Sequence, residues 1–422
     1  MNLKTKNFVK SQLKLISKVL QGLFKSSTIN DLQKCDVLFL CHDVDRSTDV
    51  RGKAFSHLLD PVRITLERLQ IKAFAIGYPH SILVGGKAFG APVALNIHFL
   101  PLVLRRKAPK FFLRFLPNPK KNPWDIVLRS CAPTKILCIG APIDLCVSAH
   151  LHQIEVIELL HGYRYNEVPW GYDQRKPEEL PHKILALDPI SQATFSKLRP
   201  EKNYCVTVTN PWYDFLDKSN EDEIPEMQSW SESLAILQRE RNQGKKVVLV
   251  CLQWGYGHDE MFGGVFPNEL FPEEITQVIQ AVERNEIWVF RLHPVQLRDQ
   301  VYRAQRQRLH DYVASHSNVF GEEFQMVPLP LMLSNVDFHI SPGSGSTAEA
   351  LMMGLPCLFV DNSAPIKKNL MSAYEVEITS KEVEFWSGVP AELADWLDHA
   401  TIKPQNLKEV FPKVVEILSQ EI

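Results

Sequence analysis

The sequence lacks most of the features that would place it in a specialised class of protein. Its eight cysteines form no C-x-x-C pair. Cysteines inside apolar runs behave as small hydrophobic residues, and Cys41, Cys138, Cys251 and Cys357 lie in or beside such runs. The formal net charge is only −2, which gives no basis for nucleic-acid binding by bulk electrostatics. We therefore expect a globular protein of a reducing cytoplasm, with neither zinc nor nucleic acid as a partner.

Long apolar runs are also missing. The longest near-apolar stretch, residues 90–104, is too short to span a bilayer and is interrupted by Asn96, His98 and Pro101. The N-terminal residues show no small-residue cleavage site, and lysines interrupt their apolar positions, so a secretory signal is not expected. These observations predict a chain without a transmembrane segment.

Acidic residues are absent from residues 1–30, where lysines and helically spaced apolar residues predict a basic amphipathic helix. Such a helix can lie on an anionic membrane surface, and a second basic, apolar stretch at 104–124 adds to this tendency. The alternative is a terminal helix docked on the protein's own core, because such helices have the same two-faced pattern. The expected location is the cytoplasm, with peripheral contact at the inner face of the cytoplasmic membrane.

Short aliphatic runs alternate with helix-length segments from Cys35 onward. Nearly all-apolar runs that end at Gly, Pro or Asp are typical of a parallel sheet covered on both faces. The pattern is interrupted by the polar residues 215–244 and then restarts, and 422 residues are enough for two domains. We predict an α/β fold with two Rossmann-like doubly wound domains that face each other across a cleft. The expected parts are an N-terminal helix (1–30), a first domain (31–214), an interdomain segment (215–244) and a second domain (245–422) whose last helix can pack back on the first.

The second predicted domain contains the segment SPGSGSTAEALMMGLP at 341–356. Ser341 closes a strand, Gly343 and Gly345 permit unusual backbone conformations, and hydroxyls gather at the start of the following helix. Because a helix N-terminus carries unpaired N–H groups and partial positive charge, this turn suits a phosphate. It has neither the Gly-Lys-Ser/Thr of a P-loop nor G-x-G-x-x-G spacing, which disfavours an NTPase or a nicotinamide enzyme. The alternative is a small-residue turn needed only for close packing.

Two further loops of the second domain carry candidate chemistry. VFRLHP at 289–294 places Arg291 and His293 at a strand end, where both can contact a phosphate and the histidine can donate a proton to a departing oxygen. A histidine satisfied within its own loop is the alternative. The loop at 251–264 offers Gln253, Asp259 and Glu260. A carboxylate in such a loop can act as a general base or as a nucleophile. Both acidic residues also fit an exposed loop.

The Ser/Gly turn in the second of two α/β domains resembles the donor-binding half of GT-B glycosyltransferases. The resemblance implies that the turn holds the phosphate of a nucleotide sugar and that Glu349 reaches the ribose or stays structural. The His-Pro pair at 293–294, with the later Ser/Thr turn, is similar to the motifs of bacterial GT-B sialyltransferases, polysialyltransferases and Kdo transferases, which use CMP-activated 2-keto sugars. The acidic motif of the sialyltransferases is matched only loosely by Asp259 and Glu260, so the resemblance favours Kdo.

In the first domain, residues 158–162 resemble the Glu-x-x-His-Gly signature of capsule and lipopolysaccharide transferases, including β-Kdo enzymes. The resemblance implies that Glu158 acts as acid or base and that His161 binds the acceptor or the leaving phosphate. Residues 38–47 end an opening strand with Asp43, Asp45 and Arg46. Either carboxylate can bind acceptor hydroxyls, and an internal Asp–Arg pair is the alternative.

These observations predict a glycosyltransferase that moves a sugar, from CMP-Kdo or another CMP-activated 2-keto sugar, to a lipid-linked or oligosaccharide acceptor in bacterial lipopolysaccharide or capsule biosynthesis. No cofactor and no metal are expected, because arginine, histidine and a helix dipole can neutralise the leaving group. The alternatives are a UDP-sugar transferase, a CDP-glycerol glycerophosphotransferase and a non-enzymatic binding scaffold. The predicted catalytic residues are Glu158, Asp259, Glu260 and His293; the donor site comprises Gln253, Arg291, His293, Ser341, Ser344, Gly345, Ser346, Thr347 and Glu349; and the acceptor site comprises Asp43, Asp45, Arg46 and His161.

Overall fold

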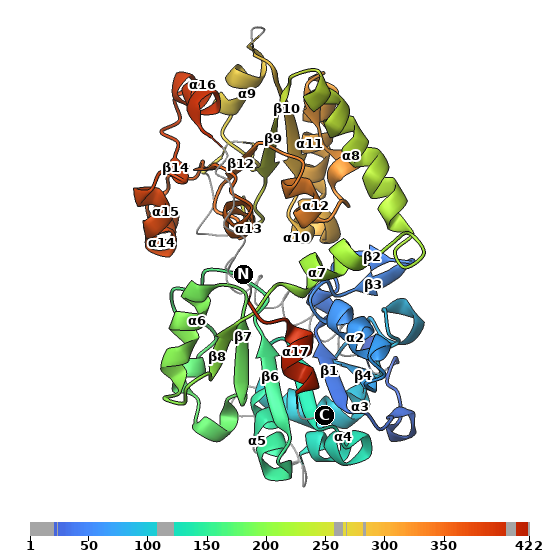
Figure 1. Ribbon diagram of the computed structural model, residues 1–422. Coiled ribbons are helices and arrows are strands. Elements are labelled where there is room, and N and C mark those ends of the chain that lie inside the picture. The colour runs from blue at the N-terminus through green and yellow to red at the C-terminus, as the bar shows by residue number, and fades with distance from the viewer. Residues whose placement is uncertain are drawn as a thin grey trace, which may run out of the picture. The chain divides into compact units, whose positions relative to one another are not determined.

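A computed structural model describes residues 21–22, 24–107, 122–256, 265–266, 268–281, 284–401 and 411–420 of the chain (Figure 1). The chain divides into two compact units. Unit 1 comprises Met1–Ser219 and Phe411–Ile422, and unit 2 comprises Asn220–Val410. Most of the predicted basic helix at 1–30 and of the basic stretch at 104–124 lies outside the described residues.

Unit 1 is built on a six-stranded parallel sheet with the order β4-β1-β5-β6-β7-β8. Its strands are β1 (Val37–Cys41), β4 (Ala73–Gly77), β5 (Lys135–Cys138), β6 (Glu155–Leu159), β7 (Lys183–Ala186) and β8 (Cys205–Thr207), and β2 (Thr48–Val50) pairs with β3 (Lys53–Phe55) in a separate antiparallel ribbon. The central strands are buried throughout, which explains their continuous apolar sequence.

Helices cover both faces of this sheet. One apolar core joins alternate residues of β1 and β5 to α3, α4 and α5, and a second joins the opposite strand faces to α2 and α17. The helices of unit 1 are α2 (Leu59–Arg68), α3 (Asn96–Lys107), α4 (Pro123–Cys131), α5 (Ile143–His152), α6 (Pro189–Phe195), α7 (Pro211–Lys218) and α17 (Val414–Ser419).

The C-terminal helix α17 belongs to unit 1, although the residues before it belong to unit 2. It packs against α2, and Lys135 Nζ donates a hydrogen bond to the backbone carbonyl of Leu418 at 3.1 Å. In Figure 1 this red helix lies among the blue and green elements of the N-terminal part of the chain. The segment predicted to link the domains, 215–244, is also divided, because α7 ends in unit 1 while α8 packs against β9 of unit 2.

Unit 2 has a second six-stranded parallel sheet, in the order β11-β10-β9-β12-β13-β14. Its strands are β9 (Lys246–Cys251), β10 (Glu286–Arg291), β11 (Val319–Phe320), β12 (Phe338–Ser341), β13 (Cys357–Phe359) and β14 (Val383–Phe385). Its helices are α8 (Glu226–Asn242), α9 (Glu274–Ile279), α10 (Pro294–Arg298), α11 (Arg303–Ala314), α12 (Leu329–Leu333), α13 (Ser346–Met352), α14 (Ala364–Ala373), α15 (Glu375–Thr379) and α16 (Pro390–His399). One core packs α9, α11 and α16 against one sheet face.

The order of the strands in each sheet indicates where a ligand is expected to bind. Counted within its own unit, the sheet of unit 2 has the order 3-2-1-4-5-6, which reverses between β9 and β12. The sheet of unit 1 has the order 2-1-3-4-5-6, which reverses between β1 and β5. Ligands in such sheets bind outside the carboxyl ends of the strands, at the reversal point. The prediction of two doubly wound α/β domains is confirmed, and no helix in the described ranges is long and apolar enough to cross a membrane.

Candidate functional site

A pocket of about 580 Å³ lies at the reversal point of unit 1, and we call it the unit 1 pocket. Its walls come from the loops that follow β1, β4, β5 and β6. They are formed by His42, Val44, Asp45, Tyr78, Ile139, Gly140, Ala141, Pro142, Ile143, His161, Trp170, Tyr172 and Arg175. The pocket therefore occupies the position at which a doubly wound sheet binds its ligand.

Asp45 supplies a carboxylate with an unsatisfied oxygen to this pocket. It ends a short 3-10 turn, Asp43–Asp45, directly after β1. Its Oδ2 is buried and has no hydrogen-bond partner within the described ranges. Burial raises the pKa of Asp45 to about 7, although the charge of Arg46 acts in the opposite direction. A buried acceptor without a partner is costly, so this oxygen is suited to a ligand hydroxyl. Its pKa also suits proton transfer near neutral pH.

The two residues predicted alongside Asp45 are engaged elsewhere. Asp43 Oδ2 accepts a hydrogen bond from the backbone N–H of Ile82 at 2.7 Å and so holds the loop after β4. Arg46 is buried and pairs with Asp60 at 2.8 Å. The alternative of an internal Asp–Arg pair thus applies to Arg46, but its partner is Asp60 of α2. Of the three predicted acceptor residues after β1, only Asp45 lines the pocket.

Stacked rings form two parts of the pocket wall. His161 and Trp170 stack with their centroids 5.5 Å apart, and His42 and Tyr78 stack at 3.4 Å. Burial lowers the pKa of His42 to about 4 and also lowers the pKa of His161, so both imidazoles are neutral at pH 7. The predicted acceptor residue His161 therefore does line the pocket, as a neutral group beside an exposed tryptophan.

Glu158 lies behind the pocket wall, on β6, and is only 1% exposed. Its Oε2 accepts hydrogen bonds from the hydroxyl of Tyr172 at 2.6 Å and from the backbone N–H of Ala141 at 3.2 Å. Burial raises the pKa of Glu158, and the hydrogen bond from Tyr172 opposes that rise. Both partners line the pocket, so the contacts of Glu158 position its wall. Its role as acid or base stays a prediction.

At the reversal point of unit 2, the carboxyl ends of β10, β9 and β12 are neighbours. Arg291 ends β10, where its Nη2 donates to the carbonyl of Gln325 at 3.3 Å. Its buried Nη1 has no hydrogen-bond partner among the residues that the structure describes. Burial lowers the pKa of Arg291, and the negative charge of Glu349 opposes this. The guanidinium remains charged. Glu349, on the helix after the Ser/Gly turn, thus acts electrostatically on Arg291.

His293 caps α10 and is held in one protonation state. Its Nδ1 accepts a hydrogen bond from the backbone N–H of Val295 at 3.2 Å, and burial lowers its pKa to about 4. A neutral imidazole that accepts at Nδ1 carries its proton at Nε2, so Nε2 is a hydrogen-bond donor. The ring centroid lies 6.3 Å from that of Trp254, which is 38% exposed after β9.

Most hydroxyls of the Ser/Gly turn bond within the turn. Ser341 Oγ accepts hydrogen bonds from the backbone N–H groups of Gly343 and Ser344, each at 3.0 Å, and bonds to the hydroxyl of Thr347 at 3.1 Å. Ser346 Oγ bonds to the buried His339 at 3.0 Å. These contacts support the close packing of strand and helix that was the alternative interpretation. Phosphate binding by the turn stays a prediction, with open space beside the Cα of Gly345.

The remaining predicted residues are less fully defined. Asp259 and Glu260 lie outside the described residues. The Oε1 of Gln253 is buried and finds no hydrogen-bond partner among those that are described. Sequence reasoning missed Arg175, Tyr172 and Trp254. The two aromatic residues lie next to recognised motifs, but no local pattern marks Arg175. In the part of the chain that the structure describes, no His, Cys, Asp and Glu side chains gather as a possible metal site.

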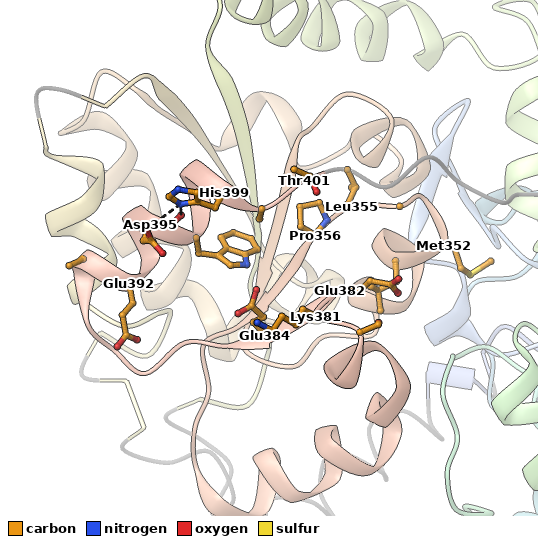
Figure 2. A pocket seen from close by; sticks show the side chains of 16 residues that line it. Met352, Leu355, Pro356, Lys381, Glu382, Glu384, Glu392, Asp395, His399 and Thr401 are labelled. Carbon is orange, nitrogen blue, oxygen red and sulfur yellow. Dashed lines mark hydrogen bonds and ion pairs between the residues drawn. The ribbon is translucent and has the colours of Figure 1, made fainter.

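A larger cavity, of about 1100 Å³, lies away from both reversal points (Figure 2). It is bordered by the residues that precede β13 and β14, among them Pro356 and Glu382, and by α16. Figure 2 shows two carboxylates, those of Glu384 and Glu392, among the side chains that line it. None of the predicted site residues lines it. Because it opens at the amino edge of the sheet, it is not where a doubly wound sheet binds its ligand.

Comparisons with known proteins bear on the fold. No protein-family model matches the sequence, and no curated protein matches it. A protein described as a UDP-N-acetylglucosamine 2-epimerase from Listeria monocytogenes has a similar structure, with a TM-score of 0.51, 12% identity, and coverage of 87% of this chain and 88% of that chain. The structure of UDP-GlcNAc 2-epimerase from Methanocaldococcus jannaschii, in complex with UDP-GlcNAc and UDP, has a TM-score of 0.47 and 15% identity. The match covers 90% of this chain and 99% of that chain. The structure of the wall teichoic acid polymerase TagF has a TM-score of 0.46 and 12% identity, and the match covers 94% of this chain and 87% of that chain.

The likeness to the Listeria protein spans both sheets, and the strand orders of unit 1 and unit 2 agree with two doubly wound domains. At this level of identity the likeness concerns the fold and leaves the substrate open. The predicted architecture is confirmed: the chain has the GT-B fold, with two Rossmann-like domains.

Proposed function

We propose that this protein is a glycosyltransferase that moves a sugar from a nucleotide-activated donor to a glycan acceptor. One observation carries the proposal. At the carboxyl edge of unit 2, Arg291 has a buried guanidinium nitrogen with no partner in the described part of the chain, and His293 accepts at Nδ1, which leaves Nε2 as a donor. A cation and a neutral donor at the reversal point of a doubly wound sheet suit a nucleotide phosphate. The GT-B fold supports the same conclusion.

In the donor site, Arg291 binds the phosphate and compensates the negative charge that grows as the sugar departs. His293 donates a hydrogen bond from Nε2 to the leaving phosphate oxygen. Trp254 offers a partly exposed aromatic face on which a nucleobase can stack. These residues account for donor binding without a metal ion.

In the acceptor site, Asp45 is the proposed base. The acceptor hydroxyl gives its proton to Asp45 while its oxygen forms a bond to the anomeric carbon. The bond between that carbon and the phosphate oxygen breaks, and its electron pair leaves with the nucleotide. Direct displacement of this kind inverts the anomeric centre. Glu158, Asp259 and Glu260 remain candidates for the same role, and a nucleophilic carboxylate would instead give retention.

The donor we propose is CMP-Kdo or another CMP-activated 2-keto sugar, and the process is lipopolysaccharide or capsule assembly at the inner face of the cytoplasmic membrane. This finer assignment is supported only by the sequence resemblance of the His-Gly, His-Pro and Ser/Thr motifs. Purified full-length protein should be incubated with CMP-Kdo, CMP-sialic acid, UDP-GlcNAc and CDP-glycerol, each with a mixture of lipid-linked and soluble glycans. Released nucleotide is measured by chromatography and the sugar product by NMR.

We expect release of CMP that depends on the acceptor, and loss of that release in the His293→Ala variant with folding unchanged. Release of UDP or CDP alone would overturn the CMP-sugar assignment while keeping a transferase. Epimerisation of the donor sugar in the absence of an acceptor would show that the protein is an epimerase and would overturn the transferase proposal. Nucleotide binding without turnover, unaffected by replacement of Asp45, Glu158, Asp259 or Glu260, would identify a binding scaffold.

A further inference from the structure

The unit 1 pocket contains one feature that a neutral sugar does not need. Among its lining residues, the only side chains with an ordinary charge at neutral pH are Asp45 and Arg175. Burial raises the pKa of Asp45 to about 7, so its carboxylate is only partly ionised at neutral pH and does not fully offset the guanidinium. Both nearby histidines are neutral, since burial lowers their pKa values. Arg175 is therefore the one cation among the residues that line the pocket.

Arg175 is fixed in place before any ligand arrives. Its guanidinium carbon lies 3.7 Å from the centroid of the Tyr172 ring, and its Nη1 donates to the carbonyl of Ala141 at 3.1 Å. The buried Glu158 holds both of these partners by hydrogen bonds. The positive charge of Arg175 favours the ionised form of the buried Glu158. A positioned guanidinium of this kind binds a carboxylate or a phosphate with two donors.

An aromatic face lies beside this cation. Trp170 is 52% exposed, and its backbone adopts a φ of 57°, which is uncommon for a residue other than glycine. Its ring stacks on His161 at 5.5 Å and meets the edge of Tyr172 at 6.1 Å. An exposed, rigidly held indole offers apolar area for the C–H face of a sugar ring.

We propose that the unit 1 pocket selects an acceptor whose terminal sugar carries one anionic group, a carboxylate or a phosphate, bound by Arg175. The ring of that sugar lies on Trp170, and its reactive hydroxyl faces Asp45. The inference rests on the proposed transferase function, because it names the acceptor of the same reaction. In this arrangement the buried Glu158 holds Tyr172 by a hydrogen bond and, through the ring of Tyr172, supports Arg175.

Matched ligands test this inference directly. The full-length protein, without nucleotide, is titrated with methyl glucuronide, methyl glucoside, glucose 6-phosphate and glucose, and binding is followed by saturation-transfer NMR and calorimetry. We expect one anionic ligand to bind at least about tenfold more tightly than its neutral counterpart, as a charge-assisted hydrogen bond gives. The tighter-binding ligand of methyl glucuronide and glucose 6-phosphate shows whether the preferred anionic group is a carboxylate or a phosphate. The preference should disappear in Arg175→Gln and survive in part in Arg175→Lys.

Arg68→Gln is the matched control, because Arg68 is an exposed arginine of the same unit outside the pocket. Melting curves exclude variants that fail to fold, and Arg175→Lys keeps the test valid if Arg175→Gln does not fold. Equal affinity for charged and neutral ligands, no binding of any probe, or equal loss of preference in Arg68→Gln would overturn the inference. Nucleotide release distinguishes the two proposals. Turnover without an anion preference would overturn only the inference about the acceptor. An anion preference without turnover on any donor would overturn the proposed transferase function.

Discussion

Replacing Asp45 by asparagine should stabilise the protein, and the gain should grow as the pH rises. The folded-state pKa of Asp45 is raised to about 7 from 3.8. Between these values the folded protein holds a proton that the unfolded chain has released, so wild-type stability falls with increasing pH through this window. A shift of about three pKa units corresponds to about 4 kcal/mol, and partial exposure to water reduces this to about 2 kcal/mol.

An asparagine side chain cannot ionise, so Asp45→Asn removes this pH-dependent loss. Chemical denaturation at pH 4.5, 6 and 8 should show a difference in unfolding free energy that is small at the lowest pH and reaches about 2 kcal/mol at the highest. Asp43→Ala is the control, since it removes the acceptor for the N–H of Ile82 and should destabilise the protein. A pH-independent difference, or an Asp45→Asn variant less stable than wild type at pH 8, would refute the reasoning. The same variant should lose transfer activity.

Other parts of the molecule give three further predictions. Tyr172→Phe removes the hydroxyl that donates to the buried Glu158, so the unfolding free energy should fall by about 1–3 kcal/mol, and an unchanged melting temperature would contradict the role of that contact. Gly343→Ala should destabilise the protein by about 1 kcal/mol or more because φ is 140° there, whereas Gly345→Ala, beside open space, should melt like wild type. Deleting residues 1–26 should release the protein from anionic vesicles in a flotation assay while activity on soluble acceptors persists, and unchanged flotation would argue against a membrane anchor.

Much of the fold was predictable because the central strands of both sheets are buried on both faces. Runs such as residues 247–250 are apolar at every position, and the turns that end them mark the sheet edges. The same turn residues correctly predicted that Arg291, His293 and Ser341 lie at or directly after strand ends. What could not be predicted was the direction of side chains in the short turns. Within one 3-10 turn, Asp43 points to the Ile82 amide while Asp45 enters the pocket.

The pattern of apolar runs and turns by itself determined that the chain forms two parallel α/β units with polar groups at their strand ends, because burial and backbone geometry act locally along the chain. Only the tertiary structure decided the strand order, and with it which strand ends meet at each reversal point. It also decided that Glu158 faces the interior and that Arg175 reaches the pocket. These outcomes depend on packing between segments far apart in sequence, which no local pattern specifies.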